Sequence, residues 1–206
     1  MTVGTKSILF GVHAFWLHPW LVALAWRRLY GFPFDPRLWV AFFVHDLGYW
    51  GKPNMDGPEG ETHPVLGSYI MWRLFDVADL NRAQRRMLMA TDLGGWPERY
   101  RRWSDFVLYH SRFYAKRDGR APSRLCFADK LSILYEPWWL YLPRAWASGE
   151  LAEYMDKGPS RDPRAYPDGR PPTRRAWLRQ VKTYMRDWVE AHKDGAADTW
   201  TPIRKG

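Results

Sequence analysis

Apolar residues recur every three or four positions along most of the chain, which is the period of an amphipathic helix. In residues 18–30, the positions of Val22, Ala25 and Leu29 form such a stripe, and Gly31 marks its end. The same spacing predicts helices over residues 36–48, 63–76, 80–92, 97–112, 122–136 and 138–155. Because strand signals are almost absent, the sequence predicts an all-α fold.

Two segments rich in Gly and Pro interrupt the helical pattern. Residues 51–60 predict a loop between two helices, and residues 158–172 predict a linker or a loop on the surface. We therefore expect one helical domain over residues 1–157, followed by a C-terminal extension over residues 173–206.

The extension contains one more amphipathic helix. One face is rich in Arg and Lys, and the other carries Trp177, Val181, Tyr184 and Trp188. We expect this apolar face to pack on the core, and a basic helix lying on a membrane surface is the alternative. His192 is expected at the surface, and the last dozen residues of the chain are expected to fray.

Composition narrows the class of protein. The chain has 206 residues, of which 46% are hydrophobic and 26% charged, as in a globular protein able to bury a core. Its single cysteine, Cys126, excludes an intramolecular disulfide and a cysteine-based zinc cluster, which favours a reducing, cytoplasmic location. The 14 tryptophans suggest an aromatic core, a ligand groove or an interfacial surface.

The net charge of +9 indicates anionic partners, which include phosphates, nucleic acid and anionic membranes. The basic residues are scattered, and the chain carries no dedicated nucleic-acid motif. The apolar stretch from Ile8 to Trp26 contains His13, His18 and Pro19, which are costly inside a lone membrane span. We therefore expect a soluble protein, and peripheral membrane contact stays open.

Ionisable residues on faces that should be buried are the main chemical signal. Burying a carboxylate costs several kcal/mol unless it is paired or bound to a metal, so a common explanation is needed. Any one buried histidine is more often a packed or hydrogen-bonded core residue than a ligand. Together, however, the imidazole and carboxylate groups fit a metal centre, and they are His18, His45, Asp46, His63, His110 and Asp129.

The order and surroundings of these residues resemble the HD-domain superfamily. The motifs that carry the resemblance lie within residues 13–140, and they are "FFVHDLGYWG", "GETHPVLGS", "LYHSRFYAKRDG" and "SRLCFADKLS". The family implies a helical bundle with a metal centre. By this resemblance, a first ion would be held by His18, His45, Asp46 and Asp129, and Asp46 would bridge to a second ion held by His63 and His110. His13 is an alternative to His18 as the first ligand.

The resemblance implies two divalent ions, Fe or Mn foremost, although Zn, Co and Ni accept the same donors. It also implies hydrolysis of a phosphoester or nucleotide-type substrate by a metal-bound hydroxide. Asp46 and Lys130 would take part in catalysis, with Glu61 as general acid or base. The cations expected to bind a small phosphorylated or otherwise anionic substrate are Lys52, Arg112, Lys116, Arg124 and Lys130.

One departure from the family pattern keeps a second chemistry open. Many members place a phosphate-contacting Lys after His-Asp-x-Gly, whereas Tyr49 and Trp50 follow here. The alternative is a dinuclear-iron oxygenase of the same superfamily, which cleaves a C–C or C–P bond with the same ligands. A third hypothesis is a non-catalytic protein that binds nucleic acid or a membrane surface, which the net charge favours.

Overall fold

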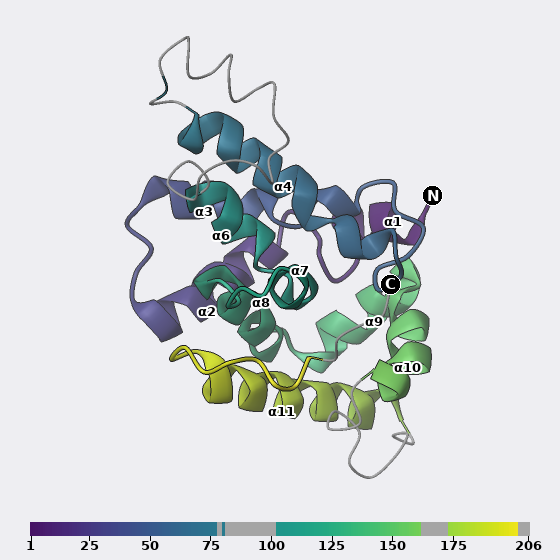
Figure 1. Ribbon diagram of the computed structural model, residues 1–206. Helices are drawn as coiled ribbons and strands as arrows, with labels where there is room; N and C mark the ends of the chain where they lie inside the picture. Colours follow the sequence, from purple (N-terminus) through teal and green to yellow (C-terminus); the bar gives the residue numbers. More distant parts are fainter. Residues whose placement is uncertain (78–79, 81–101, 162–172, 202–206) are drawn as a thin grey trace.

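The computed structural model describes residues 1–77, residue 80, residues 102–161 and residues 173–201 (Figure 1). Within these residues every regular element is helical, so the predicted all-α class is confirmed. The expected helix over residues 80–92, except Leu80, and the first part of the helix over 97–112 lie outside the described residues. None of the described helices is both long and apolar enough to cross a membrane.

The described helices and turns follow one another in a fixed order along the chain. The first half of the chain forms α1 (Val3–Phe10), α2 (His18–Tyr30), α3 (Pro36–Val44), the 3-10 turns η1 (Leu47–Tyr49) and η2 (Gly60–Thr62), α4 (Pro64–Met71) and the π-helical turn η3 (Trp72–Asp76). The second half forms α6 (Arg102–Leu108), α7 (Arg112–Arg117), α8 (Arg124–Ser132), the 3-10 turn η6 (Ile133–Tyr135), α9 (Trp138–Ser148), α10 (Glu150–Arg161) and α11 (Arg174–His192).

Helix starts follow the capping signals of the sequence. The carboxylate of Asp35 accepts a hydrogen bond from the backbone N–H of Arg37 at the start of α3. The hydroxyl of Ser123 does the same for the backbone N–H of Cys126 at the start of α8. These caps mark where the two helices begin.

Helix α3 ends earlier than its pattern predicts. It stops at Val44 instead of near Gly48, and the chain continues as the tight turn η1. A Cβ atom on Gly48 would lie 2.0 Å from the carbonyl oxygen of His63, so only glycine allows η1 to approach the start of α4 this closely. This approach brings the His45–Asp46 pair next to His63.

The helix predicted over residues 138–155 is two helices. Gly149, in the left-handed conformation with φ of +92°, separates α9 from α10. Helix α10 continues to Arg161, so the expected domain boundary at residue 157 falls inside a helix, and residues 158–161 of the expected linker are helical. The rest of that segment, residues 162–172, lies outside the described residues.

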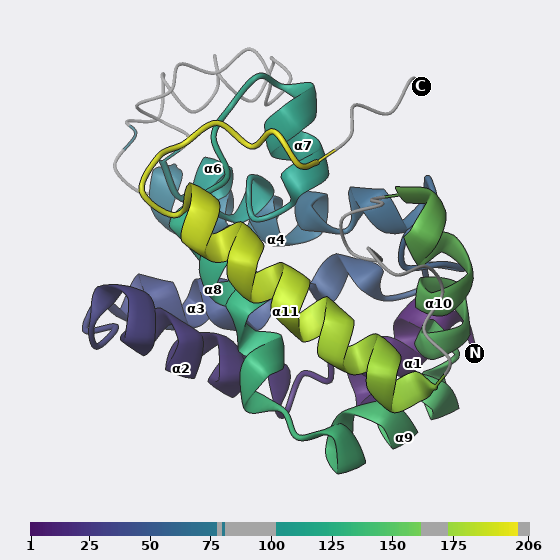
Figure 2. The same cartoon turned by 90° about the horizontal axis from the view of Figure 1, so that it is seen from below.

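Helix α8 lies in the middle of the molecule, with α2 packed along it and α11 lying across it (Figure 2). The main core cluster combines residues of α2, α3, α8 and α11, among them the fully buried Val22, Phe42, Leu125 and Trp188. The ring of Trp188 stacks on Phe127 of α8, with ring centres 5.2 Å apart. The apolar face of the C-terminal helix is therefore part of the core.

The end of α11 is covered, which corrects the expectation of an exposed His192 and, up to Thr201, of a frayed tail. Residues 202–206 of that tail lie outside the described residues. His192 is buried, and its ring stacks on Trp188. Residues 198–201 fold back over it, because one carboxylate oxygen of Asp198 accepts hydrogen bonds from the indole N–H of Trp188 and from the backbone N–H groups of Trp200 and Thr201. A single buried carboxylate thus holds the described part of the tail on the core.

Candidate metal centre

The residues expected to bind metal come from separate segments and meet in one place. Each is between 1% and 8% exposed. His18 begins α2, and His45 and Asp46 lie between α3 and η1. His63 precedes α4, His110 follows α6, and Asp129 lies in α8. The bundle therefore converges on this cluster.

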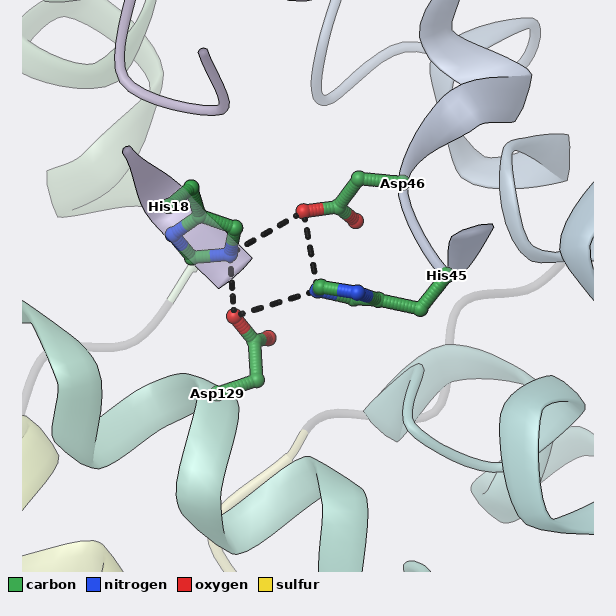
Figure 3. Close-up of side chains that lie close together, drawn as sticks. All are labelled: His18, His45, Asp46 and Asp129. Atoms are coloured by element: carbon green, nitrogen blue, oxygen red, sulfur yellow. Dashed lines mark hydrogen bonds and ion pairs between the residues drawn. The ribbon is translucent and has the colours of Figure 1, made fainter. Parts of the chain in front are cut away.

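The first group of side chains is His18, His45, Asp46 and Asp129 (Figure 3). The Nε2 atom of His18 lies 3.2 Å from Oδ2 of Asp46 and 3.1 Å from Oδ1 of Asp129. The Nε2 atom of His45 lies 3.0 Å from the same Asp46 oxygen and 3.8 Å from the same Asp129 oxygen. Two imidazole nitrogens and two carboxylate oxygens thus point at one another around a common centre.

The second group is Asp46, His63 and His110. The other oxygen of Asp46, Oδ1, lies 3.6 Å from Nε2 of His63 and 3.4 Å from Nε2 of His110. These two nitrogens are 3.1 Å apart. Asp46 therefore directs one carboxylate oxygen to each group.

Backbone carbonyl groups set the orientation of three of the histidines. The Nδ1 atom of His45 is 2.9 Å from the carbonyl oxygen of Phe42, and that of His63 is 2.8 Å from the carbonyl oxygen of Gly60. His110 makes the equivalent contact with a carbonyl three residues before it. Because a carbonyl can only accept, Nδ1 carries a proton in each ring, and Nε2 is the nitrogen that faces the cluster and could bind a metal ion.

Opposite charges dominate the first group. Burial on its own would raise the pKa of Asp46, but His45 and His13 outweigh it and hold that pKa well below its usual value. Burial would also raise the pKa of Asp129, and here Lys130 and His18 reverse the effect. Burial would lower the pKa of His45, yet the Asp46 carboxylate raises it to about 10. Both carboxylates are therefore ionised at neutral pH.

The second group has one carboxylate for two histidines, so the pKa values of its histidines are lowered instead of raised. Burial, followed by the neighbouring His110, holds the pKa of His63 well below its usual value. Burial also lowers the pKa of His110, although its hydrogen bond with Asp46 opposes this. These two imidazoles are neutral at pH 7, which is the form that binds a metal ion.

The donor set is one that divalent transition metals accept. Two of its atoms, Nε2 of His45 and Oδ2 of Asp46, are buried and have no hydrogen-bond partner in the described part of the chain, although they lie 3.0 Å from each other. A metal ion would satisfy both, because it accepts the lone pairs that hydrogen bonds leave unused. The residues could therefore hold metal ions, and the geometry fits the predicted ligands.

His13, the alternative first ligand, belongs to neither group. Its Nδ1 atom lies 3.1 Å from Oε1 of Glu150 and 2.9 Å from the hydroxyl oxygen of Ser7. Its Nε2 atom is 4.0 Å from Asp46, compared with 3.2 Å for His18. The geometry therefore favours His18. The fully buried Glu150 was not recognised from the sequence, because its partners near the site, Val12 and His13, lie more than 130 residues away in the chain.

A cavity of about 350 Å³ opens beside the cluster, and His18, His63 and Asp129 form part of its wall. The predicted catalytic residues Glu61 and Lys130 also line it. The Nζ atom of Lys130 lies 2.7 Å from Oδ2 of Asp129. Burial would lower the pKa of Lys130, but this carboxylate raises it above its usual value, so the ammonium is charged and already paired.

The other predicted phosphate-binding cations have different surroundings. Arg112 lines the cavity, but it donates hydrogen bonds to the Tyr184 hydroxyl and to Thr201, and its guanidinium lies 4.4 Å from the centre of the Trp188 ring. Three others are not among the lining residues. These are Lys52, which donates to the Thr62 hydroxyl, Lys116, which donates to the Asp198 carbonyl, and Arg124, which lies over the Tyr30 ring.

Two further features of the site were not recognised from the sequence. The ring of Tyr49 stacks on His63, with centres 3.9 Å apart and planes at 11°. Trp177, Val181 and Tyr184 of α11, expected only to pack on the core, line the cavity. Their common helical face was visible in the sequence, but the hollow that they border depends on how α11 crosses α8.

Comparison with known proteins adds no family evidence. No family model matches the chain, and neither the curated proteins nor the solved structures contain a significant match. The chain is thus an all-α protein with a buried His/Asp cluster that could hold metal ions, and its resemblance to the HD-domain superfamily rests on the motifs alone.

Proposed function

We propose that this protein is a dinuclear metal-dependent hydrolase of the HD-domain type, acting on a phosphoester. The observation that carries the proposal is the position of Asp46, whose two oxygens face two separate groups of buried ligands. A carboxylate placed in this way is suited to bridge two ions, and the motif order of the HD superfamily assigns the same role to it.

His18, His45, Asp46 and Asp129 would hold the first ion, and Asp46, His63 and His110 would hold the second. Divalent ions bound here would lower the pKa of a bound water, and their positive charge would stabilise the phosphoryl oxygens. The protein residues contribute the fixed directions of the three Nε2 atoms and the shielding of the cluster from bulk water.

Hydrolysis joins a water oxygen to phosphorus, breaks the bond from phosphorus to the leaving oxygen, and moves one proton from the water to that oxygen. Glu61 lines the cavity without belonging to either ligand group, so we assign its carboxylate to this proton transfer. Lys130 lines the same cavity, and its charged side chain is 29% exposed. We therefore assign its ammonium group to binding the phosphoryl oxygens.

The test combines metal content with turnover. The full chain is purified in air and under nitrogen, analysed for bound metals, and assayed with a phosphomonoester and a phosphodiester of p-nitrophenol. We expect about two redox-silent ions per chain and phosphoester turnover that Asp46→Ala abolishes. Asp187→Ala, an exposed aspartate of α11, is the control and keeps full activity. Two bound ions without any turnover would contradict the proposed reaction.

A dinuclear-iron oxygenase that cleaves a C–C or C–P bond is the second candidate. The apolar wall of the cavity favours it, because aliphatic and aromatic side chains from α2, η6 and α11 form much of the lining. Electron paramagnetic resonance separates the candidates. A coupled mixed-valent iron signal that oxygen and substrate alter supports the oxygenase, whereas uncoupled or silent metals support the hydrolase. Failure to bind any metal would favour the non-catalytic binding protein.

A further inference from the structure

The wall of the cavity beside the metal cluster combines two kinds of residue. The candidate ligands His18, His63 and Asp129 form one part of it. Aliphatic and aromatic side chains from several elements form another part, among them Val12, Leu21, Ile133, Trp177, Val181 and Met185. Such a division is typical of sites that hold a polar group at the reacting end and an apolar body away from it.

The cavity offers little for a substrate with several negative charges. Among the described residues, the Lys and Arg side chains that line it are Lys130 and Arg112. Lys130 is paired with Asp129, and Arg112 lies 3.5 Å from the Asp198 carboxylate while it donates to Thr201 and Tyr184. A second phosphate would have to break one of these contacts and leave a carboxylate without its partner.

Acidic side chains in the lining add to this effect. Asp56, Glu61 and Glu136 all border the cavity. Glu136 is 3% exposed and pairs with Arg144, which compensates its charge, so the repulsion is assigned to the other two carboxylates. At the low dielectric of a partly enclosed cavity, carboxylates repel additional anionic groups more strongly than they would in water. A polyphosphate chain is therefore disfavoured beyond the metal cluster.

We propose that the substrate carries a single anionic head group on an apolar body, an alkyl or aryl group, and that α11 selects it. This inference deepens the proposed function, since it rests on the metal cluster as the site that binds the head group. Val181 and Met185 are the specificity-determining residues, because both are only half-buried and both face the cavity from α11. Trp177 is 2% exposed and belongs to a core cluster, so it also supports the fold.

The test measures binding of a homologous series by calorimetry. Methyl-, butyl- and octylphosphonate share one anionic head group and differ in the length of the alkyl chain. 1-Octanol has the same alkyl chain as octylphosphonate but lacks the anionic head group. With the full chain loaded with Mn²⁺, we expect affinity to rise about fourfold per methylene until the cavity is full. Equal affinity for methyl- and octylphosphonate would overturn the inference.

Variants of α11 test the apolar wall. Val181→Trp fills the cavity, and we expect it to weaken octylphosphonate binding at least tenfold while the methylphosphonate affinity stays unchanged. Thr183→Trp, at an exposed position of the same helix, is the matched control and leaves both affinities unchanged. If Val181→Trp does not fold, Val181→Asp places a carboxylate at the same position without bulk and should have the same effect. A chain-length dependence that survives in the folded Val181 variant would also overturn the inference.

1-Octanol separates the two proposals. If octanol binds and Val181→Trp removes its binding, while the phosphonates gain nothing from their head group and no phosphoester is cleaved, the proposed hydrolase is wrong and the apolar compartment stands. If the phosphonates bind through the metal cluster and esters are cleaved, but chain length and Val181 have no effect, the hydrolase stands and the inference is overturned.

Discussion

Replacing Asp46 is expected to remove metal from both halves of the cluster. Its Oδ2 atom lies 3.2 Å and 3.0 Å from the Nε2 atoms of His18 and His45, and its Oδ1 atom lies 3.6 Å and 3.4 Å from those of His63 and His110. In the proposed two-ion site, Asp46→Ala would therefore take one ligand from each ion. Single histidine variants, such as His45→Ala, take a ligand from one ion only.

The magnitude follows from the number of ligands. Four-ligand structural zinc sites bind with about 10–16 kcal/mol, which is roughly 3 kcal/mol per ligand and roughly 100-fold in affinity. Asp46→Ala should lower the affinity of both ions by about this factor. His45→Ala should lower that of the first ion and leave the second within about tenfold, the range of indirect effects on a neighbouring ligand.

The assay is competition with a chelator of known affinity, followed by elemental analysis. Asp187→Ala serves as control for the loss of an aspartate, because Asp187 is exposed on α11. Asp46→Asn keeps the side-chain volume, so it separates loss of charge from a cavity left in the core. Circular dichroism establishes that each variant is folded. Full metal content in folded Asp46→Ala, or a loss confined to one ion, would refute the bridging role of Asp46.

Three further results are expected from the same site and its surroundings. The double variant His63→Ala/His110→Ala should retain about one metal ion per chain, and a content that stays near two would contradict the second ligand group. Lys130→Ala should weaken the affinity of the first ion about 10- to 100-fold, because Nζ of Lys130 holds the Asp129 carboxylate. Turnover at saturating metal should also fall. If neither the metal affinity nor the turnover changes, Lys130 has no role in the site. Burial would raise the pKa of Asp198, but its bonds with Thr201 and Arg112 lower it to about 2. Its contribution to stability is therefore present above pH 4 and is lost as the pH falls through 2. Asp198→Asn should cost about 2 kcal/mol of unfolding free energy at pH 7. In urea titrations the difference from the unmodified chain should vanish near pH 2, and a difference independent of pH would disprove this assignment.

Local pattern in the sequence determined the helices and the set of candidate ligands. The stripe of α2 and its end at Gly31 follow from apolar periodicity and from the freedom of glycine to adopt φ of +86°. His45, Asp46 and Asp129 stood out because charged groups on buried faces need a partner. The resemblance to the HD motifs then predicted one centre for these residues, and the structure brings their ligand atoms within 4.8 Å of one another.

Tertiary structure alone decided which groups face that centre. His13 and His18 lie close together in the sequence, yet only the remote Glu150 shows that His13 bonds away from the first ligand group. Arg112 has a charge that could bind phosphate, but the folded-back tail and the Trp188 ring already occupy its guanidinium. The periodicity of a helix shows which face is buried and not what it is buried against, because its partners come from distant parts of the chain. For this reason the sequence could indicate the candidate ligands, whereas the cavity and its apolar wall on α11 depend on how the helices pack.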